Sequence, residues 1–317
     1  MKRVGLLVGR ERTFPEALIA ELHRRGEGVE AELARIEATS SDRPPAYDVI
    51  LDRISHDVTC YQPVLKAAAL AGTRVINDPF WRMADDKFFN VALAKRLGIA
   101  VPKTVVLPSC EYGPDVSSES LRNLALVDWA SVIAEIGLPA FLKPHWGGGW
   151  HHVHHVQSLK ELLAIYDTTG RLTMMLQEEI RWTQYVRCLV VGRRDVRLAL
   201  WDPRLPHHER WIDGPRTMPP LSAELAERVA AEALTLNRAL GYDMNTVEFA
   251  VRDGVPYAID FMNSAPDLDL SSLGANHFAW VVEKMADLVI DAAHGRLAPA
   301  GPVWPFAPAL TDGERAA

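Results

Sequence analysis

The segment 141–156, FLKPHWGGGWHHVHHV, places one lysine close to three consecutive glycines. Lys143 ends an apolar run that we expect to form a strand. Gly147, Gly148 and Gly149 lack Cβ atoms, so their backbone amides can approach a ligand closely. Backbone amides and a nearby lysine together suit phosphate groups, although many glycine-rich loops only turn the chain. The segment therefore predicts either a phosphate-binding loop or a simple turn.

The four histidines of this segment offer a second chemistry, metal binding. His151, His152, His154 and His155 follow the glycines directly. If the chain leaves the loop as a strand, neighbours point to opposite faces, so residues 152 and 154 share one face. A transition-metal site needs three or more converging ligands, and this alternation separates the four. We favour a phosphate-covering loop over a metal site and assign no role to any single histidine.

Two further stretches could contact a nucleotide. Lys87 lies near the start of a predicted helix, where its alternative interpretation is an ordinary surface lysine. The apolar strand TMMLQEEI ends in Gln177, Glu178, Glu179 and Ile180. A strand end of this kind can present backbone and side-chain groups to a purine edge. Its alternative interpretation is a solvated strand terminus.

A hairpin near the C-terminal end carries oxygen ligands. The sequence NTVEFAVRDGVPYAIDFMN turns at Asp253-Gly254, a strong hairpin signal. Glu248 lies on the first strand, and Asp260 and Asn263 lie on the predicted return strand. Carboxylate and amide oxygens suit Mg²⁺ that carries nucleotide phosphates. The alternative is exposed charge on an edge hairpin.

The order of these features resembles the ATP-grasp superfamily, in particular its branch of ribosomal-protein glutamate ligases and glutathione synthetases. The features are two lysines 56 residues apart, a glycine loop, a QEE strand end, an arginine-bearing strand and an acidic hairpin closing on asparagine. VINDPFWRMADDKFFNVALAKRLGIAVPKT and NSAPD also resemble segments of that family. The likeness covers Asn77 to about Asp269. The first 76 residues fit only in architecture.

The resemblance implies a role for each part in binding ATP. Lys87 and Lys143 would hold the α- and β-phosphates, and the three glycines would close over the phosphate tail. Gln177, Glu178 and the backbone through Glu179 and Ile180 would meet the adenine. Gln184, four residues beyond Ile180, is also expected to contact the nucleotide.

The resemblance also implies the catalytic and metal-binding groups. Arg187 would face the γ-phosphate or the developing acyl phosphate, and with Lys143 it forms the catalytic pair. Glu248 and Asn263 would bind Mg²⁺, with Mn²⁺ as the alternative ion.

The chain departs from the family pattern at two positions. Tyr185 stands where a ribose-binding carboxylate is expected. Phe261 stands where the family has a metal-binding glutamate, and the acid lies one residue earlier, at Asp260. We expect Asp260 to take over the metal contact through a β-bulge before Asn263. The alternative is that Asp260 faces the core side or solvent, and that Glu248, Asn263 and water hold the metal.

The implied function is an ATP-dependent ligase that joins a small-molecule carboxylate to an amine or a thiol through an acyl phosphate. One alternative is a small-molecule kinase on the same scaffold. Another is a nucleotide-binding regulatory protein without turnover, which the altered positions 185 and 261 keep open.

The elements expected around these residues indicate an α/β and α+β protein. The first eighty residues alternate strand and helix, with Thr13 capping a helix over Phe14–Arg25, and this alternation predicts a parallel sheet. We expect a Rossmann-like domain over residues 1–83. Two α+β subdomains that grip ATP, the ATP-grasp fold, are expected over 84–180 and 181–317.

Composition excludes several other classes of protein. The 317 residues carry a net charge of −7 without a basic run, which gives nucleic-acid binding no support. No segment approaches the roughly 20 apolar residues that span a bilayer, so no membrane contact is expected. The three cysteines are isolated and predict no disulfide framework. We expect a cytoplasmic protein, a poorly ordered tail from Leu297, and leave a homo-oligomer open.

Overall fold

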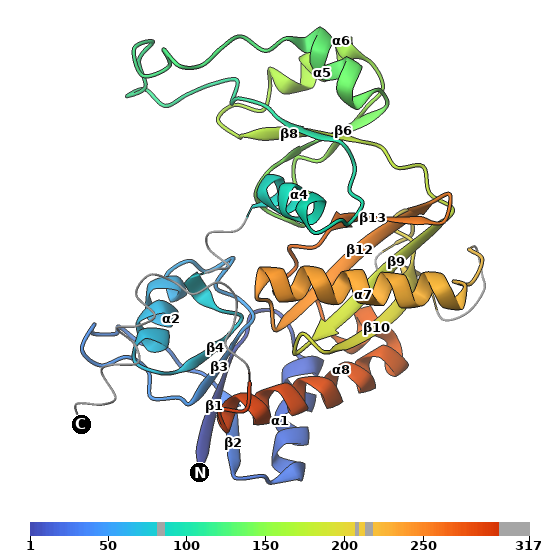
Figure 1. Ribbon diagram of the computed structural model, residues 1–317. Helices are drawn as coiled ribbons and strands as arrows, with labels where there is room; N and C mark the ends of the chain where they lie inside the picture. Colours follow the sequence, from blue (N-terminus) through green and yellow to red (C-terminus); the bar gives the residue numbers. More distant parts are fainter. Residues whose placement is uncertain (81–85, 207–208, 213–217, 298–317) are drawn as a thin grey trace. The chain divides into compact units, whose positions relative to one another are not determined.

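The computed structural model describes residues 1–80, 86–206, 209–212 and 218–297 (Figure 1). The described residues form two compact units, one from 1–80, 185–248 and 263–297, the other from 86–184 and 249–262. The expected boundary at residues 83 and 84 and the expected tail beyond Leu297 lie outside the described residues. The three domains expected from the sequence stay a prediction.

The first unit begins with a four-stranded parallel sheet in the order β2-β1-β3-β4. Its strands are β1 (Lys2–Leu7), β2 (Val29–Leu33), β3 (Val49–Asp52) and β4 (Arg74–Ile76), and its helices are α1 (Thr13–Arg25) and α2 (Tyr61–Leu70). The predicted parallel sheet is confirmed. The analysis of the sequence missed β2, whose alternate residues Glu30 and Glu32 are exposed at the sheet edge. The Rossmann-like assignment of this part stays a prediction.

The prediction that Thr13 caps α1 is wrong, because a distant residue caps this helix. Thr13 is the first helical residue, and the carboxylate of Asp269 accepts the backbone N–H groups of Arg12 (3.2 Å) and Phe14 (3.0 Å). Thr13 Oγ1 in turn donates to Asp269 (3.0 Å) and accepts the N–H of Leu270 (2.9 Å), the first residue of α8. Each helix start therefore satisfies free N–H groups of the other, which a local cap would otherwise do.

The chain also forms a five-stranded sheet in the order β11-β10-β9-β12-β13, of which β13 belongs to the second unit. Its strands are β9 (Gln184–Val191), β10 (Asp195–Trp201), β11 (Trp211–Ile212), β12 (Met244–Arg252) and β13 (Val255–Asp260). The first unit adds the helices α7 (Ala223–Leu240) and α8 (Leu270–Ala293). The boundary between the units falls inside β12, after Glu248. The predicted turn is confirmed, because Asp253 and Gly254 both have positive φ angles, 53° and 74°.

A single apolar core joins the three chain segments of the first unit. Leu6 and Phe14 of the N-terminal part, Val191 of β9 and Met285 and Leu288 of α8 belong to one buried cluster. Helices α1 and α8 lie side by side, as Figure 1 shows. The parallel sheet and the β9 end of the larger sheet therefore depend on the same helix, α8, to cover their apolar side chains.

The second unit contains a four-stranded antiparallel sheet in the order β5-β8-β6-β7. Its elements are α4 (Lys87–Arg96), β5 (Thr104–Val106), α5 (Trp129–Ile136), β6 (Ala140–Pro144), β7 (His154–Val156), α6 (Leu159–Tyr166) and β8 (Met174–Glu178). Helix α5 begins at Trp129. Asp128 caps it by accepting the N–H of Ser131 (3.2 Å), which fixes this start.

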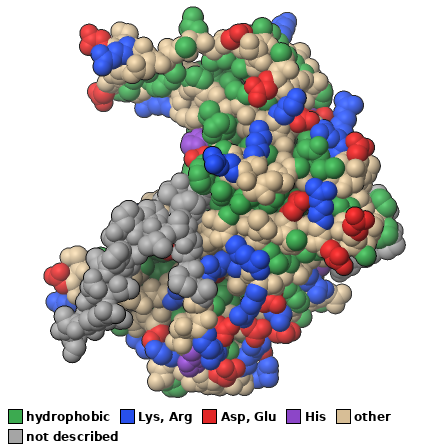
Figure 2. Space-filling model, viewed as in Figure 1, with side chains coloured by type: hydrophobic (Ala, Val, Ile, Leu, Met, Phe, Trp, Pro, Cys, Tyr) green, Lys and Arg blue, Asp and Glu red, His purple; other side chains and the backbone are tan. Residues whose placement is uncertain are grey.

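Among the described helices, none combines the length and the apolar character needed to cross a bilayer. Figure 2 shows Lys and Arg side chains intermixed with Asp and Glu side chains on the visible face.

Candidate functional site

The predicted phosphate loop lies between β6 and β7 of the second unit. Lys143 is the fourth residue of β6 and pairs with Met175 of β8. Gly147 and Gly149 have φ angles of 100° and 66°, which favour glycine. A Cβ atom at Gly148 would meet no atom within 4 Å, so the loop backbone is open to a ligand. The geometry suits an anion-binding loop.

The second predicted lysine is tied to this loop through the backbone. Asp86 caps α4 by accepting the N–H of Phe89 (2.7 Å), which makes Lys87 the first helical residue. The backbone N–H of Lys87 donates to the carbonyl of His145 (2.9 Å), two residues beyond Lys143. The structure therefore brings the start of α4 and the strand end at Lys143 together.

Asp260, a predicted metal ligand, lies in the same unit as Lys87. Its Oδ1 accepts the Lys87 ammonium at 2.8 Å, with 13% of the lysine side chain exposed. β13 ends at Asp260, so the prediction that Asn263 lies on the return strand is wrong. Asn263 is held outside the strand, where its N–H donates to Asn245 Oδ1 (3.0 Å).

The QEE strand end is a paired set of side chains rather than a solvated terminus. Gln177 is buried, and its side chain donates to Thr104 Oγ1 (3.0 Å). Glu178 accepts Arg252 Nη1 (2.8 Å), and this hydrogen bond, followed by that of Tyr257, raises the pKa of Arg252. These side chains are therefore engaged within the protein, and the contact of this strand end with a purine stays a prediction.

Two other predicted nucleotide contacts lie close to this strand end. Glu179 is paired with His155, Oε1 to Nε2, at 3.1 Å. Ile180 is buried, and Gln184 begins β9 as a nearly buried side chain. Their contacts with a nucleotide stay predictions.

The histidine cluster does not form the continuous strand expected from the sequence. His152 lies in a turn with a φ angle of 56°, and β7 begins only at His154. The predicted alternation of all four histidines is therefore wrong. His155 stacks on Phe141 (4.8 Å between ring centroids) and pairs with Glu179, which gives it a packing role. No group of three His, Cys, Asp or Glu side chains suited to a metal ion occurs in the described part of the chain.

The predicted catalytic arginine lies on the large sheet of the first unit. Arg187 Nη2 donates to Thr246 Oγ1 (3.1 Å), and its Nη1 lies 3.4 Å from Glu248 Oε1. Tyr185, on the same face of β9, donates its hydroxyl to Glu248 Oε2 at 2.8 Å. The side chains of β9 and β12 thus meet in one hydrogen-bonded set around Glu248.

Two tryptophans surround this arginine. The guanidinium carbon lies 4.9 Å from the ring centre of Trp201 and 5.6 Å from that of Trp211. Tyr185 lies against Trp201 at 5.6 Å. The Nε of Arg187 is buried and has no hydrogen-bond partner among the described residues. Aromatic faces hold the guanidinium in place without neutralising its charge.

Two more arginines belong to this region, Arg197 on β10 and Arg210 directly before β11. Arg197 donates its Nε to His277 Nδ1 (2.8 Å). Arg210 donates to the carbonyl of Leu205 (2.9 Å) and lies over Trp201. Within the described ranges, neither arginine forms an ion pair with a carboxylate.

Glu248 and Asn263 carry the oxygens predicted to bind Mg²⁺. Glu248 has a carboxylate, and the carboxamide oxygen of Asn263 is distinguished from its nitrogen because Nδ2 donates to the carbonyl of Thr246 (3.3 Å). Hard oxygen ligands of this kind suit Mg²⁺, which also keeps several waters. Phe261 is buried, with 3% of its surface exposed, and supplies no ligand.

The sequence analysis missed several members of this set. Thr246, Trp201 and Trp211 lack a spacing signal that would have identified them. Tyr185 was noted only as a departure from the family pattern. Its position two residues before Arg187 in one strand was the available signal, because residues i and i+2 share a face.

Comparison with known proteins gives both a sequence relative and structural neighbours. No model of a known protein family matches the sequence. The carbamoyl phosphate synthase large chain of Deinococcus deserti is 27% identical over 187 residues, which make up 56% of this chain. The match spans only 17% of that relative's length.

The structural neighbours cover nearly the whole chain. D-alanine–D-alanine ligase from Bacillus anthracis has a TM-score of 0.65 and 16% identity, covering 93% of this chain and 98% of the ligase. The same ligase complexed with ATP gives a TM-score of 0.63 at the same identity and coverage. The RimK domain protein ATP-grasp from Sphaerobacter thermophilus has a TM-score of 0.62 and 21% identity, covering 92% and 100%.

A third neighbour was solved with a metal ion and a nucleotide. The ATP-grasp ligase PsnB, complexed with minimal precursor, Mg and ADP, has a TM-score of 0.58 and 13% identity, covering 92% and 98%. At these identities the likeness concerns the fold. The chain described here therefore has the ATP-grasp fold, as its sequence resemblance predicted.

Proposed function

We propose that this protein is an ATP-dependent ligase that joins a small-molecule carboxylate to an amine or a thiol. The observation that carries the proposal is the contact between the start of α4 and the loop after β6, made by the Lys87 N–H and the His145 carbonyl. It unites two lysines and a glycine loop, the groups that phosphates require. The ATP-grasp fold and the sequence relative support the same class of reaction.

The proposed reaction has two steps. An oxygen of the substrate carboxylate attacks the γ-phosphorus of ATP, the bond from this phosphorus to the bridging oxygen breaks, and ADP leaves. The resulting acyl phosphate is attacked by the amine or thiol, which loses its proton as phosphate departs. Lys87, Lys143 and Arg187 would position the phosphates and balance their charge, so the chain supplies mainly orientation and electrostatic stabilisation.

A divalent cation would bind at Glu248 and Asn263. When bound, Mg²⁺ supplies positive charge to the phosphate oxygens of ATP. Glu248 and Asn263 contribute one oxygen each, and Arg187 lies beside Glu248 on the same set of contacts. Mn²⁺ has the same ligand preference and is the alternative ion.

A metabolite experiment tests the reaction class. The protein is incubated with ATP, Mg²⁺ and a cell metabolite extract, and new masses are sought. A ligase gives ADP, phosphate and a condensed product only when both partners are present. A kinase gives ADP and a phosphorylated acceptor, while a regulatory nucleotide-binding protein gives neither.

The nucleotide site is tested by Lys143→Ala. ATP with Mg²⁺ at a hundredfold excess over its dissociation constant stabilises a one-site protein by about 2.7 kcal/mol. We expect this stabilisation in the wild type and its near-complete loss in Lys143→Ala, measured as the shift of the melting temperature. Lys160→Ala, at an exposed position of α6, is the control and should keep the shift. A wild-type melting temperature that ATP leaves unchanged would contradict the nucleotide site itself.

We also propose that Asp260 contributes to metal binding once ATP is bound, although Lys87 holds its carboxylate in this structure. Asp260→Asn should then raise the Mg²⁺ concentration needed for half-maximal ATP stabilisation. If Asp260 acts only by orienting Lys87, ATP affinity at saturating Mg²⁺ falls and the Mg²⁺ dependence stays unchanged.

One observation favours the regulatory alternative. Phe261 occupies the position of the expected metal-binding glutamate and is buried in the apolar core. A protein that binds ATP and releases no ADP with any extract would fit this alternative.

A further inference from the structure

We propose that Tyr185 is a positioning residue that holds Glu248 ready for the divalent cation. This inference rests on the proposed function, because it assumes that Glu248 binds the ion carrying ATP. The basis is the 2.8 Å hydrogen bond from the Tyr185 hydroxyl to Glu248 Oε2.

The hydrogen bond fixes the orientation of the carboxylate. Oε2 of Glu248 accepts the Tyr185 hydroxyl, while Oε1 lies 3.4 Å from Arg187 Nη1, longer than a close ion pair. A carboxylate without the tyrosine contact can rotate and form a closer, two-point pair with the guanidinium. In such a pair, Glu248 would be less available to a metal ion and Arg187 less available to a phosphate.

Tyr185 is itself held firmly enough to act as a support. Only 6% of its surface is exposed, its ring packs against Trp201 at 5.6 Å, and its backbone N–H lies 3.3 Å from the Met218 sulfur. A hydroxyl on a buried, packed ring has a nearly fixed position. It can therefore orient Glu248 without becoming a ligand.

A second hydrogen bond, from Arg187 to Thr246, fixes the orientation of Arg187 in the same way. Tyr185 and Arg187 lie on one face of β9, and their partners Glu248 and Thr246 lie on one face of β12. Tyr185 bonds Glu248, and Arg187 bonds Thr246 at 3.1 Å. Two parallel contacts between neighbouring strands thus hold the acid and the arginine apart.

The arrangement also explains why a tyrosine occupies a position where the family resemblance expects a ribose-binding carboxylate. A carboxylate at position 185 would face Glu248 with a like charge and repel it. A phenol instead donates a hydrogen bond to the same oxygen. The exchange changes the role of position 185 from binding nucleotide to supporting the metal ligand.

The test is the binding of Mn²⁺ to the protein saturated with a non-hydrolysable ATP analogue, measured by electron paramagnetic resonance. Residues that orient a metal ligand typically contribute 10- to 100-fold to metal affinity. We expect Tyr185→Phe to raise the Mn²⁺ dissociation constant by about 10- to 100-fold. Tyr166→Phe is the matched control, because Tyr166 is similarly buried and loses one hydrogen bond to the carbonyl of Pro108.

A double-mutant comparison shows whether the effect passes through Glu248. In a Glu248→Gln background, Tyr185→Phe should change Mn²⁺ affinity no further. Tyr185→His keeps a hydrogen-bond donor, and it should retain more affinity than Tyr185→Phe; it also serves if the phenylalanine variant does not fold.

The possible outcomes separate this inference from the proposed function. A wild-type protein that shows no nucleotide-dependent Mn²⁺ binding overturns both. A wild type that binds Mn²⁺, together with a folded Tyr185→Phe variant of equal affinity, overturns the role of Tyr185 alone. An effect of the same size in Tyr166→Phe would also overturn it, because the loss would then come from general loosening of the fold.

Discussion

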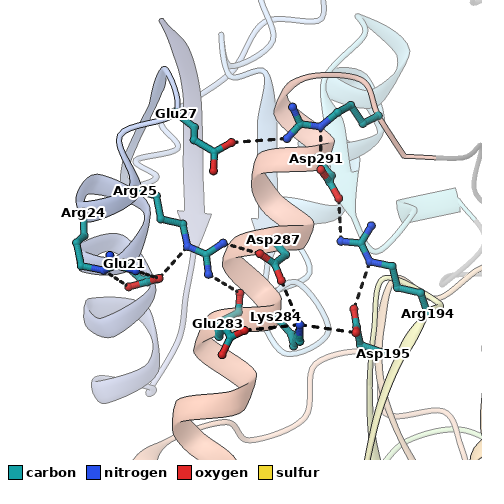
Figure 3. Close-up of polar contacts among 11 residues, drawn as sticks. Glu21, Arg24, Arg25, Glu27, Arg194, Asp195, Glu283, Lys284, Asp287 and Asp291 are labelled. Atoms are coloured by element: carbon teal, nitrogen blue, oxygen red, sulfur yellow. Dashed lines mark hydrogen bonds and ion pairs between the residues drawn. The ribbon is translucent and has the colours of Figure 1, made fainter.

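Two charged regions of the first unit differ in how their charges are balanced. Between α1 and α8, acids and bases alternate and nearly every cation faces a carboxylate, as Figure 3 shows. The residues of this α1–α8 network are Glu21, Arg24, Arg25, Glu27, Arg194, Asp195, Glu283, Lys284, Asp287, Asp291 and Arg296. The second region, here called the β9–β11 face, consists of Arg187, Arg197, Arg210, Trp201 and Trp211. Arg187 lies beside the carboxylate of Glu248, whereas Arg197 and Arg210 form no ion pair among the described residues.

The difference shows which region is complete on its own. A network whose charges are matched inside the chain needs no outside partner. A partly buried group of arginines with one acid is costly unless an anion joins it. We therefore expect the β9–β11 face to receive negative charge from a ligand, whereas the α1–α8 network joins two helices.

Of the substitutions that test this comparison, we expect Arg187→Ala to have the largest effect. Arg187→Ala should lower kcat by roughly 10²- to 10³-fold, the typical loss when one group that stabilises a transition-state charge is removed. The KM for ATP should change much less, because a contact made mainly in the transition state affects kcat more than binding. The measurement is steady-state kinetics with the substrate pair found in the metabolite experiment.

Arg228→Ala, on the exposed face of α7, is the control and should keep wild-type kinetics. An unchanged kcat with a raised KM for ATP in Arg187→Ala would contradict the assigned role. A strongly lowered melting temperature would instead identify Arg187 as a packing residue.

The next effect concerns the matched network. Arg25 is only 16% exposed and contacts Glu21, Asp287 and the carbonyl of Glu283. Arg25→Gln should lower the free energy of unfolding by about 1–3 kcal/mol, because it leaves partly buried acceptors without a charged donor. Arg194→Gln, at a side chain that is 47% exposed, should cost less than about 1 kcal/mol.

Urea unfolding of both variants gives the two values, and ATP binding should be normal in each. Equal losses of unfolding free energy in the two variants would mean that the burial of an arginine does not determine its contribution to stability. A weakened ATP affinity in Arg25→Gln would contradict the view that the α1–α8 network serves stability and not ligand binding.

The smallest effect is the pH dependence of Glu21. Hydrogen bonds from Arg24 and then Arg25 lower the pKa of Glu21 from 4.5 to about 2. Because the folded pKa lies below the unfolded one, the charged form stabilises the fold above pH 4.5, and this contribution is lost as the pH falls towards 2.

The stability difference between wild type and Glu21→Gln should accordingly shrink between about pH 5 and pH 2. It should remain below about 1 kcal/mol at neutral pH, since Arg24 is exposed and solvent screens the pair. Unfolding curves across this range give the measurement, and a difference that grows as the pH falls would have the wrong sign.

Local chemistry explains which parts of the fold were predictable. Asp253-Gly254 forms the predicted turn, because this signal acts within a few residues. The cap of α1 failed because its acceptor, Asp269, lies 256 residues from Thr13. A distant acceptor leaves no mark near the helix that it caps.

The candidate site shows the same division. Lys87, Lys143 and Glu248 were found because their order along the chain resembles a known family. The contact of Tyr185 with Glu248 spans 63 residues and depends on which strands become neighbours. The sequence indicated that position 185 was unusual, whereas the role that we propose for it depends on the pairing of β9 and β12.

The exchange of caps between α1 and α8 has a consequence for biosynthesis. Thr13 and Asp269 are 256 residues apart, and at 5–20 residues per second a ribosome needs roughly 10 to 50 seconds to add that length. During this interval the nascent chain carries α1 and the parallel sheet without the helix that covers them. We expect this stretch to need chaperone protection while it waits, and chains truncated before α8 to be degraded or to aggregate.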